Sequence, residues 1–290
     1  MNDLKQITVI GLGLLGGSVA LTGQRFAGPV KVFGFSHRAA TRKKAKEILL
    51  GTQIADNLAD SVVGSDIVIL ATPIRTFEDI LAQIGSSLKA GAIVTDVGST
   101  KVQPHKWAKK TLPKNVHYVG SHPIAGSEQR GVEFARDDLF EQADCIVTVT
   151  KNTNKKAVSI LKDFWLRMGC RVKFMTPAEH DKVFANVSHL AHIAAAALLN
   201  ANNTDQLQYS GKGFLDTCRV AGGPPNIWVD ILSTNSANCA KGIDKLKKEL
   251  DEFKTAILKG DNNKLQKLLE RARDRRADLI KNKLQKRELV

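Results

Sequence analysis

The spacing of hydrophobic residues along this 290-residue chain changes near residue 175. Before that point, short β-branched runs alternate with segments whose apolar residues recur at helical spacing, which is the pattern of parallel βαβ units. We predict helices between the strands, including 13–27 and 155–168. The predicted strands are 6–10, 30–35, 67–71, 92–96, 116–120, 145–150 and 171–174.

After residue 175 the pattern is helical throughout. Thr176-Pro177-Ala178-Glu179 combines an N-cap, a proline at the first helical position and a capping-box glutamate, so a long helix is expected to start there. Helical periodicity continues over 183–201, 227–258 and 263–283, with breaks at 222–225 and 260–261. The sequence therefore predicts a doubly wound α/β domain over 1–175 and an all-helical domain over 176–290.

Composition favours a soluble globular protein of the cytoplasm. Hydrophobic residues make up 43% of the chain and charged residues 25%, which is ordinary for a folded domain. The four cysteines are far apart and form no CxxC pair, which argues against a disulfide framework or a zinc site, and we expect no metal. The first apolar run is too short for a signal peptide, and the alanine-rich run 193–201 is too short to span a bilayer.

The formal net charge of +14 raises the question of nucleic acid. About half of this excess lies after Lys241, where acidic residues alternate with the basic ones. Aromatic residues are not interleaved with them, as they are in single-strand binding surfaces. We interpret this segment as a solvated helical face, and we expect neither nucleic acid nor membrane as a partner.

A glycine-rich turn follows the first predicted strand. Gly11–Gly16 reads GLGLLG, a GxGxxG motif between a strand and a helix. The first glycine permits a tight turn, the second lets the backbone approach a pyrophosphate, and the third lets helix and strand pack closely. The segment therefore predicts a Rossmann-type site for a dinucleotide.

The residues that follow the second strand favour NADP. An NAD site commonly has Asp or Glu there to bind the ribose 2′-hydroxyl, whereas this chain has Ser36-His37-Arg38. A 2′-phosphate could accept hydrogen bonds from Ser36 and a charge-assisted contact from Arg38. Alternatively, Arg38 is a solvated loop residue. NAD remains possible.

His122 is the strongest catalytic candidate. It follows the apolar segment 117–120 and precedes a loop restrained by Pro123 and Gly126. Ligands of open α/β sheets bind outside the carboxyl ends of the strands, where a histidine with a pKa near neutrality can act as a general base. A structural histidine at a strand end is the alternative.

Three other segments carry chemistry that complements His122. Ser99 follows the fourth long strand, in DVGSTK, and is expected at the same sheet edge. His189 and His192 share one helix face at i and i+3, although both could be satisfied interior histidines. Arg219 can bind a carboxylate and has Trp228 nearby, but it could instead form a buried ion pair with Asp216.

Taken in order, these segments resemble the prephenate/arogenate dehydrogenase family of tyrosine biosynthesis. The resemblance covers GLGLLGGS, DVGSTK, GSHPIAGSE, SHLAH, DTCRVA and the segment GDNNKLQKLLERARDRR. It implies oxidative decarboxylation of prephenate or arogenate with hydride transfer to NAD(P). The sequence leaves open which of these substrates is used and whether tyrosine inhibits.

The resemblance also implies residue roles. His122 would accept the proton of the substrate's C4 hydroxyl, and Ser99 would bind that hydroxyl or orient the histidine. In the substrate site, Glu128 would gate access, unless it is only a solvated loop residue. His192 would face the substrate side chain. Arg219 would bind the ring carboxylate, and Trp228 would form part of the wall of the same pocket. The expected cofactor-binding residues are Gly11, Leu12, Gly13, Leu14, Leu15, Gly16, Ser36, His37, Arg38, Thr72, Pro73 and His189.

Two other functions remain open at this stage. A β-hydroxyacid dehydrogenase would share the domain plan, but such enzymes typically use a lysine in the helical part. A non-catalytic nucleotide-binding redox sensor would use the basic C-terminal segment to contact a partner. Because the helical region has more apolar surface than a short bundle can bury, we also expect a homodimer through this domain.

Overall fold

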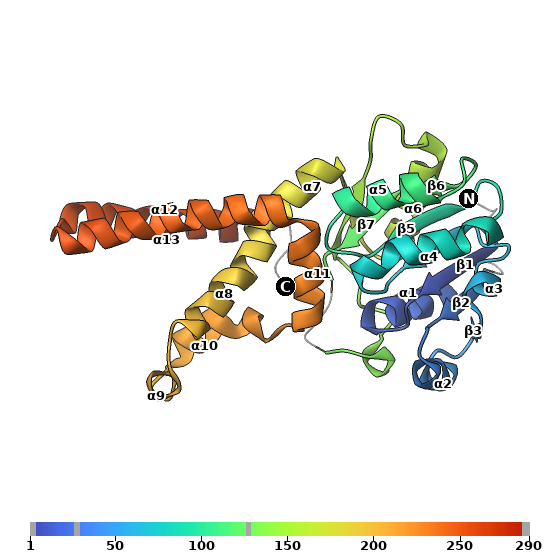
Figure 1. The fold of residues 1–290 in the computed structure, drawn as a ribbon, viewed down its shortest axis with the longest axis horizontal. Coiled ribbons are helices and arrows are strands. Elements are labelled where there is room, and N and C mark those ends of the chain that lie inside the picture. The colour runs from blue at the N-terminus through green and yellow to red at the C-terminus, as the bar shows by residue number, and fades with distance from the viewer. Residues whose placement is uncertain (1–3, 26–29, 126–128, 286–290) are drawn as a thin grey trace. The chain divides into compact units, whose positions relative to one another are not determined.

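The computed structural model describes residues 4–25, 30–125 and 129–285. The chain divides into two compact units, residues 1–236 and 237–290. The last strand ends at Met175, and every element described after it is helical (Figure 1). The predicted class, an α/β sheet followed by a helical region, is confirmed. The division into domains at residue 175 stays a prediction.

The main sheet has six parallel strands in the order β3-β2-β1-β4-β5-β6. The reversal of strand order beside β1 is the topology of Rossmann folds, in which the carboxyl ends of β1, β4 and β5 meet at one edge. β3 was not predicted, because it has only three residues and none of them is fully buried. The strands are β1 Gln6–Ile10, β2 Lys31–Phe35, β3 Thr52–Ile54, β4 Ile67–Leu70, β5 Ile93–Asp96 and β6 His117–Tyr118.

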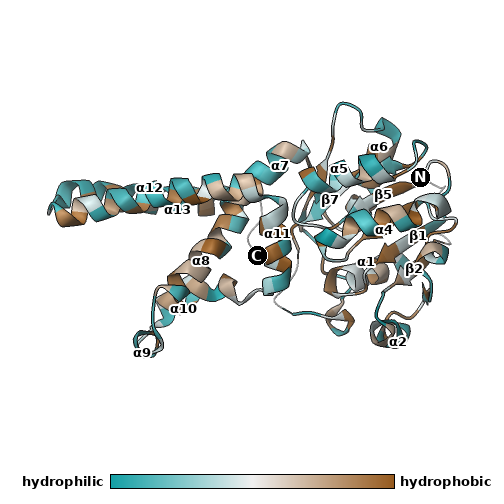
Figure 2. Ribbon diagram, viewed as in Figure 1, coloured by the Kyte–Doolittle hydropathy of each residue, from teal (hydrophilic) through white to brown (hydrophobic). Residues whose placement is uncertain are grey.

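Helices cover both faces of this sheet, so its central strands are buried on both sides. In β4, Ile67 and Ile69 belong to one apolar core, and Val68 and Leu70 belong to the other. The first core includes α1 (Leu14–Gln24) and α6 (Lys155–Arg167), and the second includes α4 (Phe77–Ile84) and α5 (Val102–Thr111). Figure 2 shows the apolar colours concentrated on the strands between these layers. The shorter helices α2 (Ala39–Ile48) and α3 (Leu58–Ser61) follow β2 and β3.

A second sheet corrects the predicted strand arrangement. It contains β7 (Gly120–Pro123), β8 (Asp144–Thr148) and β9 (Arg171–Met175), and β7 runs antiparallel to β8. The predicted strand 116–120 is therefore divided between two sheets, because the chain leaves β5 after the bond from Val119 N to Val94 O. His122 pairs with Ile146 in β7, so its prediction as a residue between a strand and a loop was wrong.

The long helix predicted at Thr176 is present, and its start is confirmed in detail. Thr176 and Glu179 form the capping box, and Pro177 occupies the first turn of α7 (Pro177–Phe184). A π-helical turn, Ala185–His189, separates α7 from α8 (Leu190–Asn200). Such turns often occur at functional sites. The helices that follow are α9 Thr204–Leu207, α10 Lys212–Cys218 and α11 Pro225–Thr234.

The run Pro177–Asn200 is long and apolar enough, by length and composition alone, to cross a membrane. It nevertheless contains His180 and Asp181, whose side chains are buried in protein and hydrogen-bonded there. That arrangement is typical of a helix that lines a site in a folded domain, and the criterion by itself is weak evidence for a membrane span.

The described part of the second compact unit, residues 237–285, forms a helical hairpin. α12 (Ser236–Leu258) and α13 (Asn262–Gln285) are joined at Gly260, which has a φ of +62°. Lys264 pairs with Glu252 at 3.1 Å, and Arg271 pairs with Glu249 at 2.5 Å. Hydrophilic colours predominate on both helices in Figure 2, yet Leu250, Leu269 and Leu279 are more than half exposed. The predicted break at 260–261 is confirmed, whereas the predicted helix 227–258 is interrupted at Asn235.

Candidate functional site

The glycine-rich turn has the geometry that a bound pyrophosphate requires. Gly11 has a φ of +102°, which disfavours other residues. A Cβ on Gly16 would lie 1.8 Å from the carbonyl oxygen of Gly11, whereas a Cβ on Gly13 would meet nothing within 4 Å. Gly13 caps α1 without a side-chain hydrogen bond, so backbone N–H groups are presented at the helix N-terminus. Leu12 is buried in the core, and Leu14 and Leu15 are partly buried against it, so the backbone N–H groups of this turn are its main polar groups for a ligand.

A cavity of about 370 Å³ adjoins this turn. Five of the predicted cofactor-binding residues line it, together with the apolar side chains of Ile10, Phe35, Leu58 and Ile80. Its polarity and position suit an adenosine moiety at the end of β2. The predicted residues that it brings together are Gly11, Ser36, His37, Thr72 and Pro73.

The loop after β2 is held by Arg42 on α2. Arg42 donates to the carbonyl oxygens of Ser36 at 2.8 Å and His37 at 3.2 Å, and it pairs with Asp56. Its guanidinium is thereby committed to the loop. Arg38, by contrast, is exposed at the N-cap of α2, next in sequence to the cavity wall.

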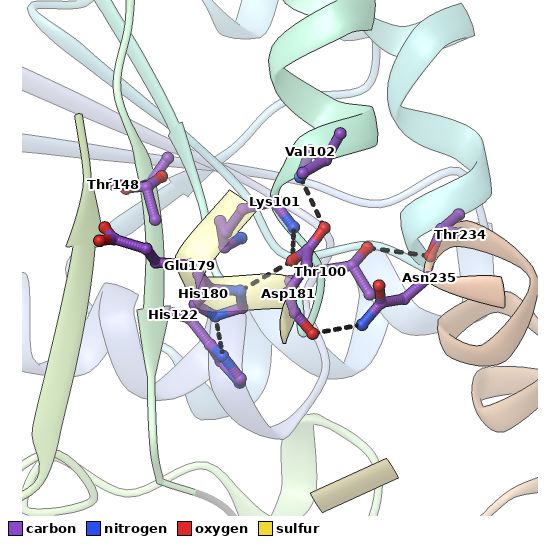
Figure 3. Close-up of polar contacts among 12 residues, drawn as sticks. Thr100, Lys101, Val102, His122, Thr148, Glu179, His180, Asp181, Thr234 and Asn235 are labelled. Carbon is purple, nitrogen blue, oxygen red and sulfur yellow. Dashed lines mark hydrogen bonds and ion pairs between the residues drawn. The ribbon is translucent and has the colours of Figure 1, made fainter. Parts of the chain in front are cut away.

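The predicted base, His122, is joined to a second histidine from the helical region. His122 Nδ1 lies 2.8 Å from His180 Nε2, and His180 Nδ1 lies 2.8 Å from Asp181 Oδ1 (Figure 3). Phe184 stacks on His180 with 4.4 Å between ring centroids, and its ring lies 4.8 Å from that of His122. These contacts fix the orientation of the His122 ring.

Asp181 ties this pair of histidines to the edge of the main sheet. Its Oδ1 accepts from the backbone N–H of Lys101 at 2.7 Å, and its Oδ2 accepts from that of Val102 at 2.9 Å. These two N–H groups belong to the N-terminus of α5, where a carboxylate is favoured. Asn235 also donates to the Asp181 carbonyl oxygen at 2.8 Å. His122 is therefore linked to the segment that follows β5, at the same edge as the glycine-rich turn after β1.

Burial determines the protonation of the site. Burial first, then the neighbouring His180 and the Lys101 ammonium, hold the pKa of His122 well below its usual 6.5. Burial and the Lys101 charge also lower the pKa of His180, and burial raises that of Asp181 against the two backbone N–H groups. The expectation of a near-neutral pKa is not met, but a neutral imidazole is the form that can accept a proton.

Lys101 is itself fully buried and pairs with buried Asp96. Asp96 also accepts from Tyr118 Oη at 2.6 Å and from Gly98 N at 2.7 Å. Burial, followed by the Asp96 charge, raises the pKa of Tyr118 well above 10. This compensated ion pair places a positive charge behind the histidines without leaving it unpaired.

Ser99 and His189 meet through the backbone of Ser99, which hydrogen-bonds His189. Within the described parts of the chain, no hydrogen bond joins the Ser99 side chain to His122, so His180 orients the base instead. His189 is buried, its Nδ1 lies 3.3 Å from Asn235 Nδ2, and burial lowers its pKa to about 4. These contacts support the pocket. Direct contact between His189 and a cofactor stays a prediction.

The rings of His192 and Trp228 lie against each other, and their part in the substrate pocket stays a prediction. Their rings stack with centroids 3.6 Å apart, and His192 Nδ1 lies 2.8 Å from the carbonyl oxygen of Val220. A Cβ on Gly223 would lie 2.4 Å from Trp228 Nε1, so a glycine at this position makes room for the indole.

Arg219 begins the 3₁₀ turn Arg219–Gly222 and is exposed. Since Asp216 is exposed too, the alternative of a buried Asp216–Arg219 ion pair is wrong. Glu128, the predicted gate, lies outside the described residues.

The sequence interpretation missed His180 and Asp181. Both lie in the first turns of α7, directly after the capping box, whose signal is structural. In the sequence, the only local sign of their role is that a His and an Asp are adjacent near the start of a helix. Adjacent polar residues are common at helix starts, so this sign does not single them out.

Across the described ranges, no group of three or more His, Cys, Asp or Glu side chains is arranged to hold a metal ion.

Comparison with known proteins agrees with this geometry. A family model described as the nucleotide-binding domain of prephenate dehydrogenase matches residues 19–174, and one described as its dimerization domain matches 176–271. The chain belongs to the prephenate dehydrogenase family. Cyclohexadienyl dehydrogenase of Zymomonas mobilis is 32% identical over 91% of this chain and 92% of its own. Prephenate dehydrogenase of Bacillus subtilis is 32% identical over 96% of this chain and 77% of its own.

Solved structures agree. Prephenate dehydrogenase of Aquifex aeolicus, in complex with hydroxyphenyl propionate and NAD+, superposes with a TM-score of 0.89 at 32% identity, covering 96% of this chain and 99% of that one. Synechocystis arogenate dehydrogenase gives a TM-score of 0.81 at 29% identity, with 94% and 99% covered. A 3-hydroxyisobutyrate dehydrogenase of Mycobacterium tuberculosis, over 77% and 73% of the two chains, reaches only 0.51 at 16% identity, which shows a shared fold and lends no support to the β-hydroxyacid alternative.

Proposed function

We propose that this protein oxidatively decarboxylates prephenate or arogenate, transferring hydride to a nicotinamide dinucleotide. The observation that carries the proposal is the position of His122, oriented by His180 at the sheet edge that also carries the GxGxxG turn. Family membership supplies the substrate class. In the non-catalytic alternative, a sensor would not need a rigidly oriented imidazole at this position.

The residues present fit a dinucleotide. The pyrophosphate would lie at the N-terminus of α1 over Gly13, and the adenosine in the cavity lined by Ser36, His37 and Thr72. When bound, the nicotinamide supplies the acceptor for the hydride that leaves C4 of the substrate ring. The side chains near His122 must therefore hold the ring, its hydroxyl and its carboxylate.

His122 takes and returns one proton in this reaction. Its imidazole accepts the proton of the C4 hydroxyl while the C–H electron pair departs as hydride. The ring carboxylate then leaves as CO2, the electron pair of that C–C bond passes into the ring, and the same proton returns to the oxygen. The product is a phenol, and no net proton is released. A positioned base contributes roughly 10²–10⁴-fold to such a step.

The remaining residues hold the substrate. Arg219 would bind the ring carboxylate, a charge-assisted contact worth about 1.5–3 kcal/mol. The His192–Trp228 stack would line the side-chain end, Ser99 would bind the reacting hydroxyl, and Glu128 would control access.

The test is reduction of cofactor at 340 nm by purified protein given prephenate or arogenate, each with NADP or NAD. We expect turnover of at least one substrate, with 4-hydroxyphenylpyruvate or tyrosine as product. Absence of reduction with both substrates and both cofactors would refute the proposal and favour the sensor. Comparing the two substrates directly also decides which one this enzyme uses.

We further propose that NADP is preferred over NAD. The loop after β2 carries no carboxylate, and exposed Arg38 adjoins the cavity wall. The Aquifex relative was solved with NAD+, so the proposed preference rests on the residues of this chain alone. We expect a higher kcat/KM for NADP, and a reversal in Ser36→Asp, which would repel a 2′-phosphate. If kcat/KM for NADP equals kcat/KM for NAD in both the wild type and Ser36→Asp, the proposed preference is wrong.

We also propose a cytoplasmic homodimer through the helical region. The matching family model is described as a dimerization domain, and exposed leucines on α12 and α13 would be covered by a second copy. Light scattering at micromolar concentration should show a dimer that Leu269→Lys weakens. Leu50→Lys, at a residue that is also more than half exposed but lies in the nucleotide-binding part, should leave it intact. A monomeric wild type would contradict the proposal.

A further inference from the structure

In the hydrogen bonds to the Asp181 carboxylate, the donor and the acceptor can each be assigned. The backbone N–H groups of Lys101 and Val102 can only donate, so both carboxylate oxygens of Asp181 act as acceptors. Asp181 Oδ1 must then also accept from His180 Nδ1, at 2.8 Å. The proton of the neutral His180 ring is therefore on Nδ1.

The position of the proton on His180 determines the position of the proton on His122. With its proton on Nδ1, His180 offers Nε2 as an acceptor, and His122 Nδ1 at 2.8 Å must donate to it. The proton of neutral His122 is then on Nδ1, and its Nε2 is left bare. A bare nitrogen is what a general base needs.

We propose that His180 and Asp181 are positioning residues that hold His122 in the Nδ1–H tautomer, with Nε2 as the base, and that stabilise the imidazolium formed when Nε2 is protonated. This inference rests on the proposed function. Both residues are at most 1% exposed and come from α7, whereas His122 comes from β7, so the helical region sets the chemistry of a base on the α/β part.

The burial of His180 and Asp181 is consistent with a reaction that releases no net proton. Since the proton taken by His122 returns to the substrate oxygen within the same turnover, no path from His180 to solvent is needed. The carboxylate of Asp181 compensates the transient positive charge, while the charge of nearby Lys101 is balanced by Asp96.

The first test measures the tautomer directly. In protein labelled with nitrogen-15 in its seven histidines, ring nitrogen shifts at neutral pH report which nitrogen is protonated, and His122→Asn assigns the signal. We expect His122 to show a protonated Nδ1 and a bare Nε2. The opposite tautomer would overturn the inference. This readout does not depend on turnover, so it remains decisive even if the proposed reaction fails.

The second test separates hydrogen bonding from packing. His180→Leu removes the acceptor, whereas His180→Gln offers a carbonyl to His122 and an NH2 toward Asp181. We expect kcat to fall at least 100-fold in His180→Leu and to recover at least tenfold in His180→Gln, with KM values for substrate and cofactor within about threefold of wild type. Equal kcat values in the two variants would show that His180 only fills space. If His180→Leu does not fold, the wild-type tautomer decides.

The third test removes the charge. Asp181→Asn keeps an acceptor oxygen for Lys101 N and for His180, so the tautomer should persist. The variant loses the negative charge and the acceptor for Val102 N, and we expect kcat to fall about tenfold or more. The matched control is Glu179→Gln. Glu179 is an exposed neighbour on α7, and in Figure 3 its side chain points away from the hydrogen-bonded side chains of His180 and Asp181. An Asp181→Asn enzyme as active as Glu179→Gln would remove charge stabilisation from the inference.

Discussion

The nucleotide site and the catalytic site of this protein are built in opposite ways. The nucleotide site uses backbone groups of consecutive residues, Gly11–Gly16, and depends on the absence of side chains. The catalytic site uses side chains from β5, β7, α7 and the residue after α11, held by hydrogen bonds between residues up to 80 positions apart. The first is a local device, and the second exists only once the chain is folded.

This difference determines how each site can fail. Adding one carbon atom at Gly11 or Gly16 disturbs the nucleotide site sterically, whereas the catalytic site depends on each hydrogen-bond donor and acceptor that orients His122. Substitutions should therefore act on binding and stability in the first case and on kcat in the second. The predictions below test this contrast from the largest expected effect to the smallest.

His122→Asn should produce the largest loss. Asparagine retains polarity but not a basic nitrogen, so we expect kcat to fall by roughly 10²–10⁴ while KM changes little. Steady-state kinetics with the preferred substrate measures this. His117→Asn, on neighbouring β6, is the control and should be near wild type. A selective rise in KM in His122→Asn would show that this histidine anchors substrate instead of accepting its proton.

Arg219→Ala should act on binding. Removing a charge-assisted contact of about 1.5–3 kcal/mol raises KM by roughly 10- to 150-fold and leaves kcat within a few fold. Lys212→Ala, which removes an exposed cation at the start of α10, should have little effect. A loss confined to kcat would exchange the roles of Arg219 and His122.

The same contrast explains what the sequence reveals. The GxGxxG turn, the capping box at Thr176 and most long strands are local signals, and the structure contains each of them. β7 was missed as a separate strand because Gly120, His122 and Pro123 have loop-like composition, and only pairing with β8 makes them extended. The role of Asp181 depends on reaching the N-terminus of α5, 79 and 80 residues away in sequence, so no local pattern contains it.

Gly16→Ala and Gly13→Ala test the local site as a matched pair. The Cβ of Gly16→Ala would overlap the Gly11 carbonyl, so we expect about 1–3 kcal/mol or more of destabilisation in urea unfolding. Gly13→Ala has open space around its Cβ and should fold with a smaller loss, since alanine is a poor N-cap. It should still weaken cofactor binding, because the added methyl lies where the pyrophosphate approaches. Equal stability of the two variants would show that the turn can relax.

The smallest expected effect is the contribution of His105 to the pH dependence of the free energy of unfolding. Burial, and then the Lys101 charge, lower the pKa of His105 to about 4 from an unfolded value near 6.5. Between these values the unfolded chain binds a proton that the folded protein excludes, so the free energy of unfolding should fall as pH drops below about 6.5 and be independent of this group above it. At about pH 5.5 the loss from one such histidine is about 1.4 kcal/mol. His105→Gln can keep the hydrogen bond to Thr148, which is 2.9 Å long in the wild type, without the titration. Urea unfolding at about pH 7 and pH 5.5 should therefore show a smaller pH-dependent loss in His105→Gln than in wild type, and identical losses would mean that His105 titrates normally in the folded protein.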